Sequence, residues 1–305
     1  MLIFAVSDKG GAGRTVTSAN LAYHRTLAGD DVCYLDFDFG SPTAADVFDV
    51  ADARRATEDR GLHAHLLGET GEPARIDVWS ETEHPVLRSP PPGCGRLILM
   101  PGDPSGGEFA ISRDYLRRCV DLLMTLYYEF DLVVVDLSAG RSYAVDMVLE
   151  ATAQPEMSEI TARWLVFHRW TREHVAAAAS LVFGKRGIVT GGVHLGHDEE
   201  ALRHAIRFVR TAVPDPESFL WSQVSPTQSA WMRQTDGNLK QLAAKHGIGR
   251  GQVLGSVPLE PVLQWREQLI TEEDVYGSQI ANMATLQALS ALAGRLTDET
   301  YWEQA

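Results

Sequence analysis

Short apolar runs alternate with longer amphipathic stretches along most of the chain. Most of these runs are nearly continuous in Val, Ile, Leu and Phe, as expected for strands covered on both faces. The predicted strands are LIFAVS (2–7), VCYLDFD (32–38), RLILMPG (96–102), LVVVDLS (132–138), RWLVFH (163–168), GIVTGGVHL (187–195), FLWSQVS (219–225) and VLGSVPL (253–259). Apolar residues recur at helical spacing over 14–28, 112–128, 171–183, 199–211 and 277–296. The alternation predicts an α/β fold with a doubly wound, mostly parallel sheet flanked by helices on both faces.

Several helix boundaries carry local signals. Gly29 follows the first predicted helix, where glycine commonly ends a helix. Thr171 is a predicted N-cap, with Glu173 in the first turn of its helix. In the last predicted helix the residues at core-facing spacing are Ile280, Met283, Leu286, Leu289, Leu292 and Leu296.

The length of 305 residues and the hydrophobic content of 45% suffice for a substantial core, as one large domain or two smaller ones. The segments 51–95 and 150–162 are rich in Pro, Gly, Glu and small residues, and are typical of surface excursions rather than linkers. We therefore expect one domain over residues 1–305.

The charge and cysteine content narrow the class of protein. The chain has no apolar run of about 18 residues and no leader-like N-terminus, so we expect a soluble, cytoplasmic protein. Its three cysteines lack metal-ligand spacing and are expected to be reduced and structural. The net charge of −14 disfavours broad attraction to nucleic acid or to an anionic membrane.

A glycine-rich turn, SDKGGAG (7–13), links the first predicted strand to the first predicted helix. Such a turn can point several backbone N–H groups inward, and the helix N-terminus adds partial positive charge, which suits a polyphosphate. The standard phosphate-loop pattern fails twice, because Asp8 replaces its first glycine and Arg14 replaces its lysine. An ordinary glycine turn is the alternative.

Carboxylates follow two other predicted strands. Asp36 and Asp38 are two residues apart at the end of one strand, so their side chains point to the same side. Asp136 ends another strand and is followed by Gly140. Because ligands bind at the carboxyl ends of strands in an open parallel sheet, the three carboxylates and the glycine turn predict one site.

Five motifs together resemble the MinD/ParA family of deviant Walker A ATPases, within the P-loop NTPases. They are KGGAGRT followed by SANLA, LDFDFG, LILMPG, DLVVVDLSAG and LGSVPLEPVLQWREQLI, and they span most of the chain from residue 1 to about 295. The segments 51–95 and 190–250 diverge most from the family pattern, which implies surface insertions there.

The resemblance implies ATP and Mg²⁺ as ligands and leaves GTP open. The residues that it assigns to the nucleotide are Gly10, Gly11, Ala12, Gly13, Arg14, Thr15, Val16 and Gly140. Those that it assigns to the metal or its waters are Thr15, Asp36 and Asp136. Lys9 would reach across a nucleotide-sandwich homodimer, and Asp38 would position the attacking water. Residues 38–46 and 136–146 would be switch segments.

Arg14 departs from the family pattern, and two functional hypotheses follow from this departure. Arginine keeps the positive charge and suits phosphate oxygens, but its bulk can misplace the γ-phosphate, so we expect slow hydrolysis. Lys9, Thr15, Asp38 and Asp136 favour an ATP-dependent dimerisation switch that acts on a protein partner. Arg14 favours the alternative, a catalytically impaired nucleotide-binding regulatory or scaffold subunit.

A second departure follows the strand at 163–168, where the family has a proline-containing loop. Here His168, Arg169 and Trp170 are expected in a loop at the ligand edge. A packed Trp170 is the favoured prediction, and contact of Trp170 or Arg169 with nucleotide or a partner is the alternative. Gln223 or Ser225 lies near the position where the family reads the base, but neither is assigned that role.

The distribution of charge disfavours a membrane and nonspecific DNA as binding partners. The acidic end LAGRLTDETYWEQA argues against the basic membrane helix that ends MinD proteins. Arg203, Arg207 and Arg210 are predicted on one face of the helix 199–211, either as a solvated face or as a contact for nonspecific DNA, which the net charge disfavours.

Overall fold

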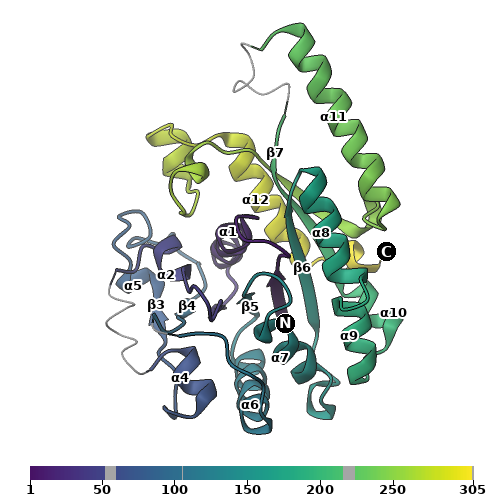
Figure 1. The fold of residues 1–305 in the computed structure, drawn as a ribbon. Coiled ribbons are helices and arrows are strands. Elements are labelled where there is room, and N and C mark those ends of the chain that lie inside the picture. Colours follow the sequence, from purple (N-terminus) through teal and green to yellow (C-terminus); the bar gives the residue numbers. More distant parts are fainter. Residues whose placement is uncertain (52–59, 105, 216–223, 304–305) are drawn as a thin grey trace.

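A computed structural model describes residues 1–51, 60–104, 106–215 and 224–303 (Figure 1). Its sheet has eight strands in the order β3-β4-β2-β5-β1-β6-β7-β8, and all neighbours are parallel except β3 and β4. The strands are β1 (Leu2–Val6), β2 (Val32–Phe37), β3 (Ile76–Asp77), β4 (Leu97–Met100), β5 (Leu132–Leu137), β6 (Ala162–Arg169), β7 (Ile206–Val213) and β8 (Val253–Pro258). The predicted mostly parallel α/β sheet is confirmed.

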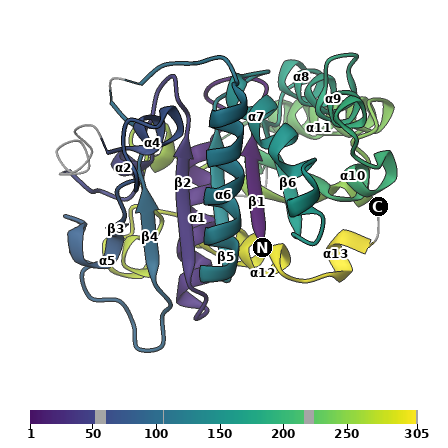
Figure 2. The ribbon, with the colours of Figure 1, turned by 90° about the horizontal axis from the view of Figure 1, so that it is seen from below.

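Helices cover both faces of the sheet. They are α1 (Arg14–Leu27), α2 (Ala44–Val47), α4 (Leu62–Leu67), α5 (Val78–Glu81), α6 (Arg113–Glu129), α7 (Tyr143–Thr152), α8 (Arg172–Phe183), α9 (Ile188–Leu195), α10 (Glu199–His204), α11 (Pro226–Lys245), α12 (Met283–Leu296) and α13 (Thr300–Glu303). In Figure 2, α6 lies in front of the strands and α1 lies behind them. The predicted helices at 14–28, 112–128 and 171–183 are confirmed, and Thr171 caps α8 by accepting a hydrogen bond from the His174 N–H.

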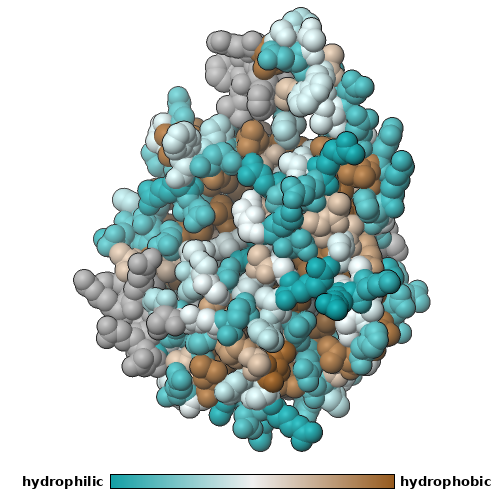
Figure 3. All heavy atoms as spheres, viewed as in Figure 1, coloured by the Kyte–Doolittle hydropathy of each residue, from teal (hydrophilic) through white to brown (hydrophobic). Residues whose placement is uncertain are grey.

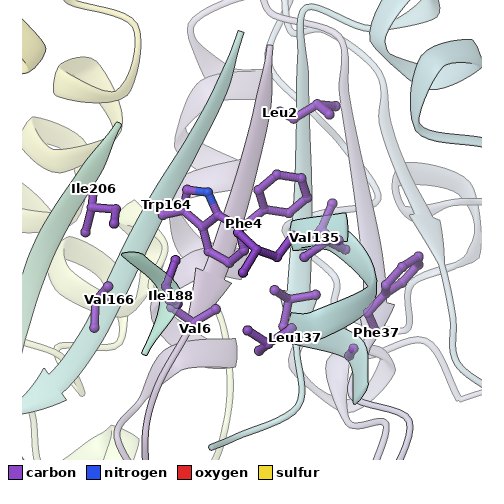
Figure 4. Packing of buried hydrophobic residues seen from close by; sticks show 14 of the residues in the cluster. Leu2, Phe4, Val6, Phe37, Val135, Leu137, Trp164, Val166, Ile188 and Ile206 are labelled. Atoms are coloured by element: carbon purple, nitrogen blue, oxygen red, sulfur yellow. The ribbon is translucent and has the colours of Figure 1, made fainter. Parts of the chain in front are cut away.

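Alternation along the strands divides the core into two layers. On β1, Leu2, Phe4 and Val6 face the layer that contains α6, α7, α8 and α9 (Figure 4). Ile3 and Ala5 face the opposite layer, which contains α1 and α12. Because every residue of β1, β2 and β5 is buried, these three strands form a rigid support for the segments that leave their carboxyl ends.

The predicted strand at 187–195 is wrong, because this segment forms α9. Glycines bound the helix: Gly187 is its N-cap, and Gly196 ends it with a left-handed φ of 105°. A Cβ at Gly192 would lie 2.4 Å from Leu202 Cδ2, so the glycine allows close packing against α10. The β-branched residues of this segment therefore gave a misleading strand signal.

The predicted helix at 199–211 is also wrong over its second half, because α10 ends at His204 and β7 begins at Ile206. Arg203, Arg207 and Arg210 consequently do not share one helical face. Arg207 is fully buried and donates hydrogen bonds to the carbonyl groups of Tyr301 (2.9 Å) and Trp302. The proposed basic stripe does not exist.

The chain between β7 and β8 holds the long helix α11, which was not predicted and which extends beyond the body of the sheet (Figure 1). Of the predicted strand at 219–225, residues 219–223 lie outside the described part of the chain, and residues 224–225 are not in a strand. The helix predicted at 277–296 is α12, which begins at Met283 rather than at 277. Ile280 and Met283 are each 51% exposed, so their core-facing prediction is wrong.

Hydrophilic residues cover much of the face drawn in Figure 3, with smaller apolar areas between them. Across the described residues, none of the helices has the length and apolar character needed to cross a membrane.

Candidate functional site

The glycine loop, residues 7–13, leaves β1 and enters α1. Gly11 and Gly13 have left-handed φ values of 71° and 72°, which favour glycine. Gly13 is the N-cap of α1 and supplies no side-chain cap. The first-turn N–H groups of α1 are therefore left to an outside acceptor, and together with the helix dipole they form an anion-binding geometry.

A cavity of about 250 Å³, here called the loop cavity, lies beside the glycine loop. Its lining comes from the loop, α1, the ends of β6, β7 and β8, and the segment after β8: Gly11, Ala12, Gly13, Val16, Thr17, Arg169, Thr211, Ala212, Val257, Pro258, Glu260, Leu263, Gln264 and Glu267. The Thr211 hydroxyl donates a 2.6 Å hydrogen bond to the Ala12 carbonyl, which ties the loop to β7. A compact organic group attached to a phosphate in the loop would have a cavity next to it.

The Arg14 side chain points to the strand-end carboxylates. Its Nη2 donates to Asp38 Oδ2 at 2.8 Å, and its Nε donates to Asp136 Oδ1. Nη2 also lies 3.3 Å from the Thr15 hydroxyl oxygen. Arg14 is only 7% exposed, and although burial opposes its charge, Asp136 and Asp38 raise its pKa overall. The guanidinium is therefore a fixed positive charge between two carboxylates.

Asp36 holds the chain that follows β2. Its Oδ1 accepts a 3.2 Å hydrogen bond from the Asp38 N–H, and its Oδ2 accepts a 2.9 Å bond from the Ala44 N–H. Burial, followed by the nearby charge of Asp136, raises the pKa of Asp36 to about 8. Asp36 is thus mostly neutral at pH 7, and its hydrogen bonds hold the backbone of residues 38–44 in place.

Asp136 and Gly140 lie where β5 leaves the sheet. Asp136 Oδ2 is buried and has no hydrogen-bond partner among the described residues, and burial raises the pKa of this carboxyl while Arg14 opposes the rise. The Gly140 N–H donates a 2.7 Å hydrogen bond to the Ser7 carbonyl. Gly140 therefore braces the glycine loop through its own backbone.

Lys9 lies at the outer side of the loop and forms an ion pair with Glu173 at the start of α8. The Lys9 side chain is 39% exposed and that of Glu173 is 74% exposed. Ion pairs of this kind contribute little to stability, so Lys9 can leave Glu173 at small cost.

The arrangement does not fit Mg²⁺ on the residues that the resemblance assigns to it. Mg²⁺ requires oxygen ligands in near-octahedral geometry. Both Asp36 oxygens accept backbone N–H groups, while Arg14 contacts Asp136 and lies near the Thr15 hydroxyl. Nowhere in residues 1–51, 60–104, 106–215 and 224–303 do three or more His, Cys, Asp or Glu side chains form a group that could hold a metal.

The residues expected in a loop after β6 belong mostly to the strand, because β6 extends through His168 and Arg169. Trp170 is buried, donates a 2.8 Å hydrogen bond from Nε1 to Asp236 Oδ1, and has the Arg210 guanidinium 4.0 Å from its ring centroid. Trp170 is therefore a packed residue, whereas Arg169 lines the loop cavity.

Neither residue named near the base-reading position can be placed against the loop cavity. Gln223 lies outside the described residues. Ser225 is the N-cap of α11 and forms a capping box with Gln228. The cavity residues that the sequence left unassigned include Thr211, Glu260 and Gln264. The motif SVPLEPVLQ contains two of them and was noted only as a resemblance.

Comparisons of the sequence and of the structure with known proteins both find MinD proteins. A scan against models of protein families finds no match. The septum site-determining protein MinD of Bacillus subtilis (strain 168) is 28% identical over 140 residues, a region that is 45% of this chain and 45% of that protein. The aligned part therefore spans about half the length of the curated relative.

Solved structures cover nearly the whole chain at low identity. MinD of Pyrococcus horikoshii OT3, complexed with Mg-ADP, has a TM-score of 0.55 and 15% identity, and the match covers 98% of this chain and 96% of that one. A plasmid partition protein of Borrelia burgdorferi B31 bound to AMPPNP has a TM-score of 0.59, 14% identity and 97% coverage of both chains. The pNOB8 ParA bound to nonspecific DNA has a TM-score of 0.56, 17% identity and coverage of 97% and 98%. The chain has the fold of the MinD and ParA P-loop NTPases.

Proposed function

We propose that this protein is a nucleotide-binding regulator whose bound ATP controls its self-association, with weak or absent hydrolysis. One observation carries the proposal: the left-handed glycine loop enters an uncapped α1 directly beside the loop cavity. Phosphates would bind the N–H groups of the loop and of the first turn, and the nucleoside would enter the cavity.

Two structural relatives support nucleotide as the ligand. The Pyrococcus MinD structure is a complex with Mg-ADP, and the Borrelia partition protein is bound to AMPPNP. Both are similar to this chain over nearly its full length, but their low identity transfers the fold and not the individual contacts.

The contacts of Arg14 favour a protein without efficient turnover. A carboxylate that positions water needs free lone pairs and a suitable place beside the γ-phosphate. Here Arg14 engages Asp38, and the same guanidinium engages Asp136. Between the two functional alternatives, the regulatory subunit with impaired catalysis therefore accounts better for the geometry than a magnesium-dependent hydrolytic switch.

Self-association through the nucleotide face is supported by two exposed residues. Lys9 lies on the loop and pairs with the exposed Glu173, an ion pair that can break at small cost, so Lys9 is available to a second copy. Trp265 is 91% exposed and directly follows Gln264, which lines the loop cavity. A homodimer that closes over the nucleotide would use both residues.

We propose that the binding partner of the ATP-bound dimer is a protein. A similar structure is a complex of MinC with MinD from Aquifex aeolicus, with a TM-score of 0.55 and 14% identity. DNA is disfavoured, because the net charge is −14 and the arginine stripe considered as an alternative contact for it is not formed.

Light scattering after size exclusion tests the proposal, with samples lacking nucleotide or holding ADP, ATP or a slowly hydrolysed ATP analogue. We expect a dimer with ATP and with the analogue, little phosphate release, and loss of the dimer in Lys9→Ala. Lys185→Ala, at another exposed lysine, is the matched control. One oligomeric state under every condition would reject nucleotide-controlled self-association.

A further inference from the structure

We infer that Arg14 is itself the cation of this site: its guanidinium takes the place that the resemblance gives to Mg²⁺, and ATP binds without a divalent metal. The inference rests on the proposed nucleotide binding and concerns which cation balances the negative charge of the site when ATP is bound.

Three oxygen-bearing groups converge on Arg14 from different elements. Asp136 belongs to β5, Asp38 follows β2, and Thr15 is in the first turn of α1. These groups include two of the three assigned to the metal and the one assigned to the attacking water. Arg14 contacts both carboxylates and lies 3.3 Å from the hydroxyl.

The shape of the arginine side chain explains why one residue can serve both carboxylates. The planar guanidinium carries donors in a fixed fork, so Nε can serve Asp136 while Nη2 serves Asp38. A lysine has one compact ammonium group on a flexible stem and lacks this fork. An arginine at position 14 is therefore suited to hold two strand ends together.

Burial keeps the cation in place. The side chains of Arg14, Asp38 and Asp136 are 7%, 18% and 0% exposed. A metal at this position would have to displace the guanidinium and leave it buried without its carboxylates, which is strongly unfavourable. Arg14 and backbone N–H groups engage the other oxygens of Asp36, Asp38 and Asp136. Of these three carboxylates, only the unpartnered Asp136 Oδ2 is left to a metal or its waters.

The phosphates would then depend on the backbone. The N–H groups of the glycine loop, the N-terminus of α1 and the exposed Lys9 remain available to them, and none of these requires a divalent cation. ATP affinity should therefore be insensitive to Mg²⁺. Replacing Arg14 by lysine should free Asp136 and Thr15 and make the affinity depend on Mg²⁺.

Isothermal titration calorimetry with ATP tests the inference, in buffer with excess Mg²⁺ and in buffer with EDTA. We expect dissociation constants for the wild type that agree within about twofold, and binding by Arg14→Lys that is about tenfold tighter with Mg²⁺. Arg25→Lys, at an arginine that pairs with Asp30 away from the loop, is the matched control and should behave as the wild type.

The outcomes separate the two claims. Wild-type binding that is tenfold or more tighter with Mg²⁺ overturns the inference about Arg14 and leaves nucleotide binding intact. Absence of ATP binding in both buffers overturns the proposed function and the inference together. The wild-type comparison decides the inference even if Arg14→Lys does not fold.

Discussion

Arg14 and Asp136 are 122 positions apart in the chain, and their side chains form a buried ion pair. The sheet brings them together, because β5 pairs with β1 on one side and with β2 on the other, with Asp136 opposite both Ala5 and Asp36. Asp136 therefore lies beside β1, which enters the glycine loop, and β2, which is followed by Asp38. A substitution in this ion pair therefore alters the surroundings of both the glycine loop and the segment that follows β2.

Breaking the pair from one side should destabilise the protein. Arg14→Met leaves Asp136 buried without its counter-charge, and loss of one partner of a buried pair typically costs about 3–5 kcal/mol. Urea unfolding without nucleotide measures this loss. The double variant Arg14→Met/Asp136→Leu should recover a large part of it, because the fully buried carboxylate left without its partner is then also removed. Equal losses in the single and double variants would show that the pair is not coupled.

Gly13 should not accept a side chain, for reasons of backbone conformation. A Cβ there would meet Thr211 Cβ at an ordinary 3.7 Å, but the φ of 72° is left-handed. Gly13→Ala is expected to lose about 1–2 kcal/mol in unfolding free energy and to bind ATP more weakly. Gly10→Ala is the matched control, because Gly10 lacks a left-handed φ and has no atom within 4 Å of its would-be Cβ. Similar losses in both variants would contradict the assigned loop geometry.

Asp36 should give the protein a specific pH dependence. Its pKa is raised from 3.8 to about 8 in the folded protein. The folded state therefore binds the extra proton between these values, and the stability contributed by Asp36 is full below the lower pKa and is lost as the pH rises to about 8.

The Asp36→Asn variant isolates this contribution. Between pH 5 and 7, where Asp36 holds its extra proton only in the folded state, the wild type should lose about 1.4 kcal/mol per pH unit relative to the variant. Urea unfolding of both proteins at several pH values measures the difference. Parallel stability curves would mean that Asp36 is ionised in the folded protein at neutral pH.

Glu173 should restrain Lys9 without supporting the fold. Glu173→Gln removes an exposed ion pair, so we expect thermal stability to be unchanged and nucleotide-dependent dimerisation to be retained or strengthened. Thermal unfolding and light scattering on the same samples test both expectations. A variant that binds ATP but no longer dimerises would mean that the Lys9–Glu173 pair is itself part of the dimer-forming surface.

The convergence of the glycine loop with Asp36, Asp38 and Asp136 could be predicted from the sequence, because apolar strands followed by carboxylates place those side chains at one sheet edge. The direction of the Arg14 side chain could not. Its position in the motif indicated phosphate, but the segment after β2 brings Asp38 close to the buried Asp136 of β5, and both carboxylates engage the guanidinium.

The errors around α10 and β7 have a similar origin. Leu202, Ile206 and Val209 follow a helical spacing, although Ile206 and Val209 belong to a strand. Arg207 within that strand is buried because carbonyl groups near the C-terminus accept its hydrogen bonds and the Trp302 ring lies 5.1 Å from its guanidinium carbon. A pattern of neighbouring residues cannot predict hydrogen-bond partners that are almost a hundred residues away in the chain.

A crystal structure of the protein grown with ATP and Mg²⁺ would show whether Arg14 or a metal ion holds the cation position of the site. We expect phosphates bound to the N–H groups of the glycine loop and α1, with the Arg14 guanidinium still between Asp38 and Asp136. A metal ion coordinated by Thr15 and Asp136, with Arg14 turned away from both carboxylates, would contradict this expectation.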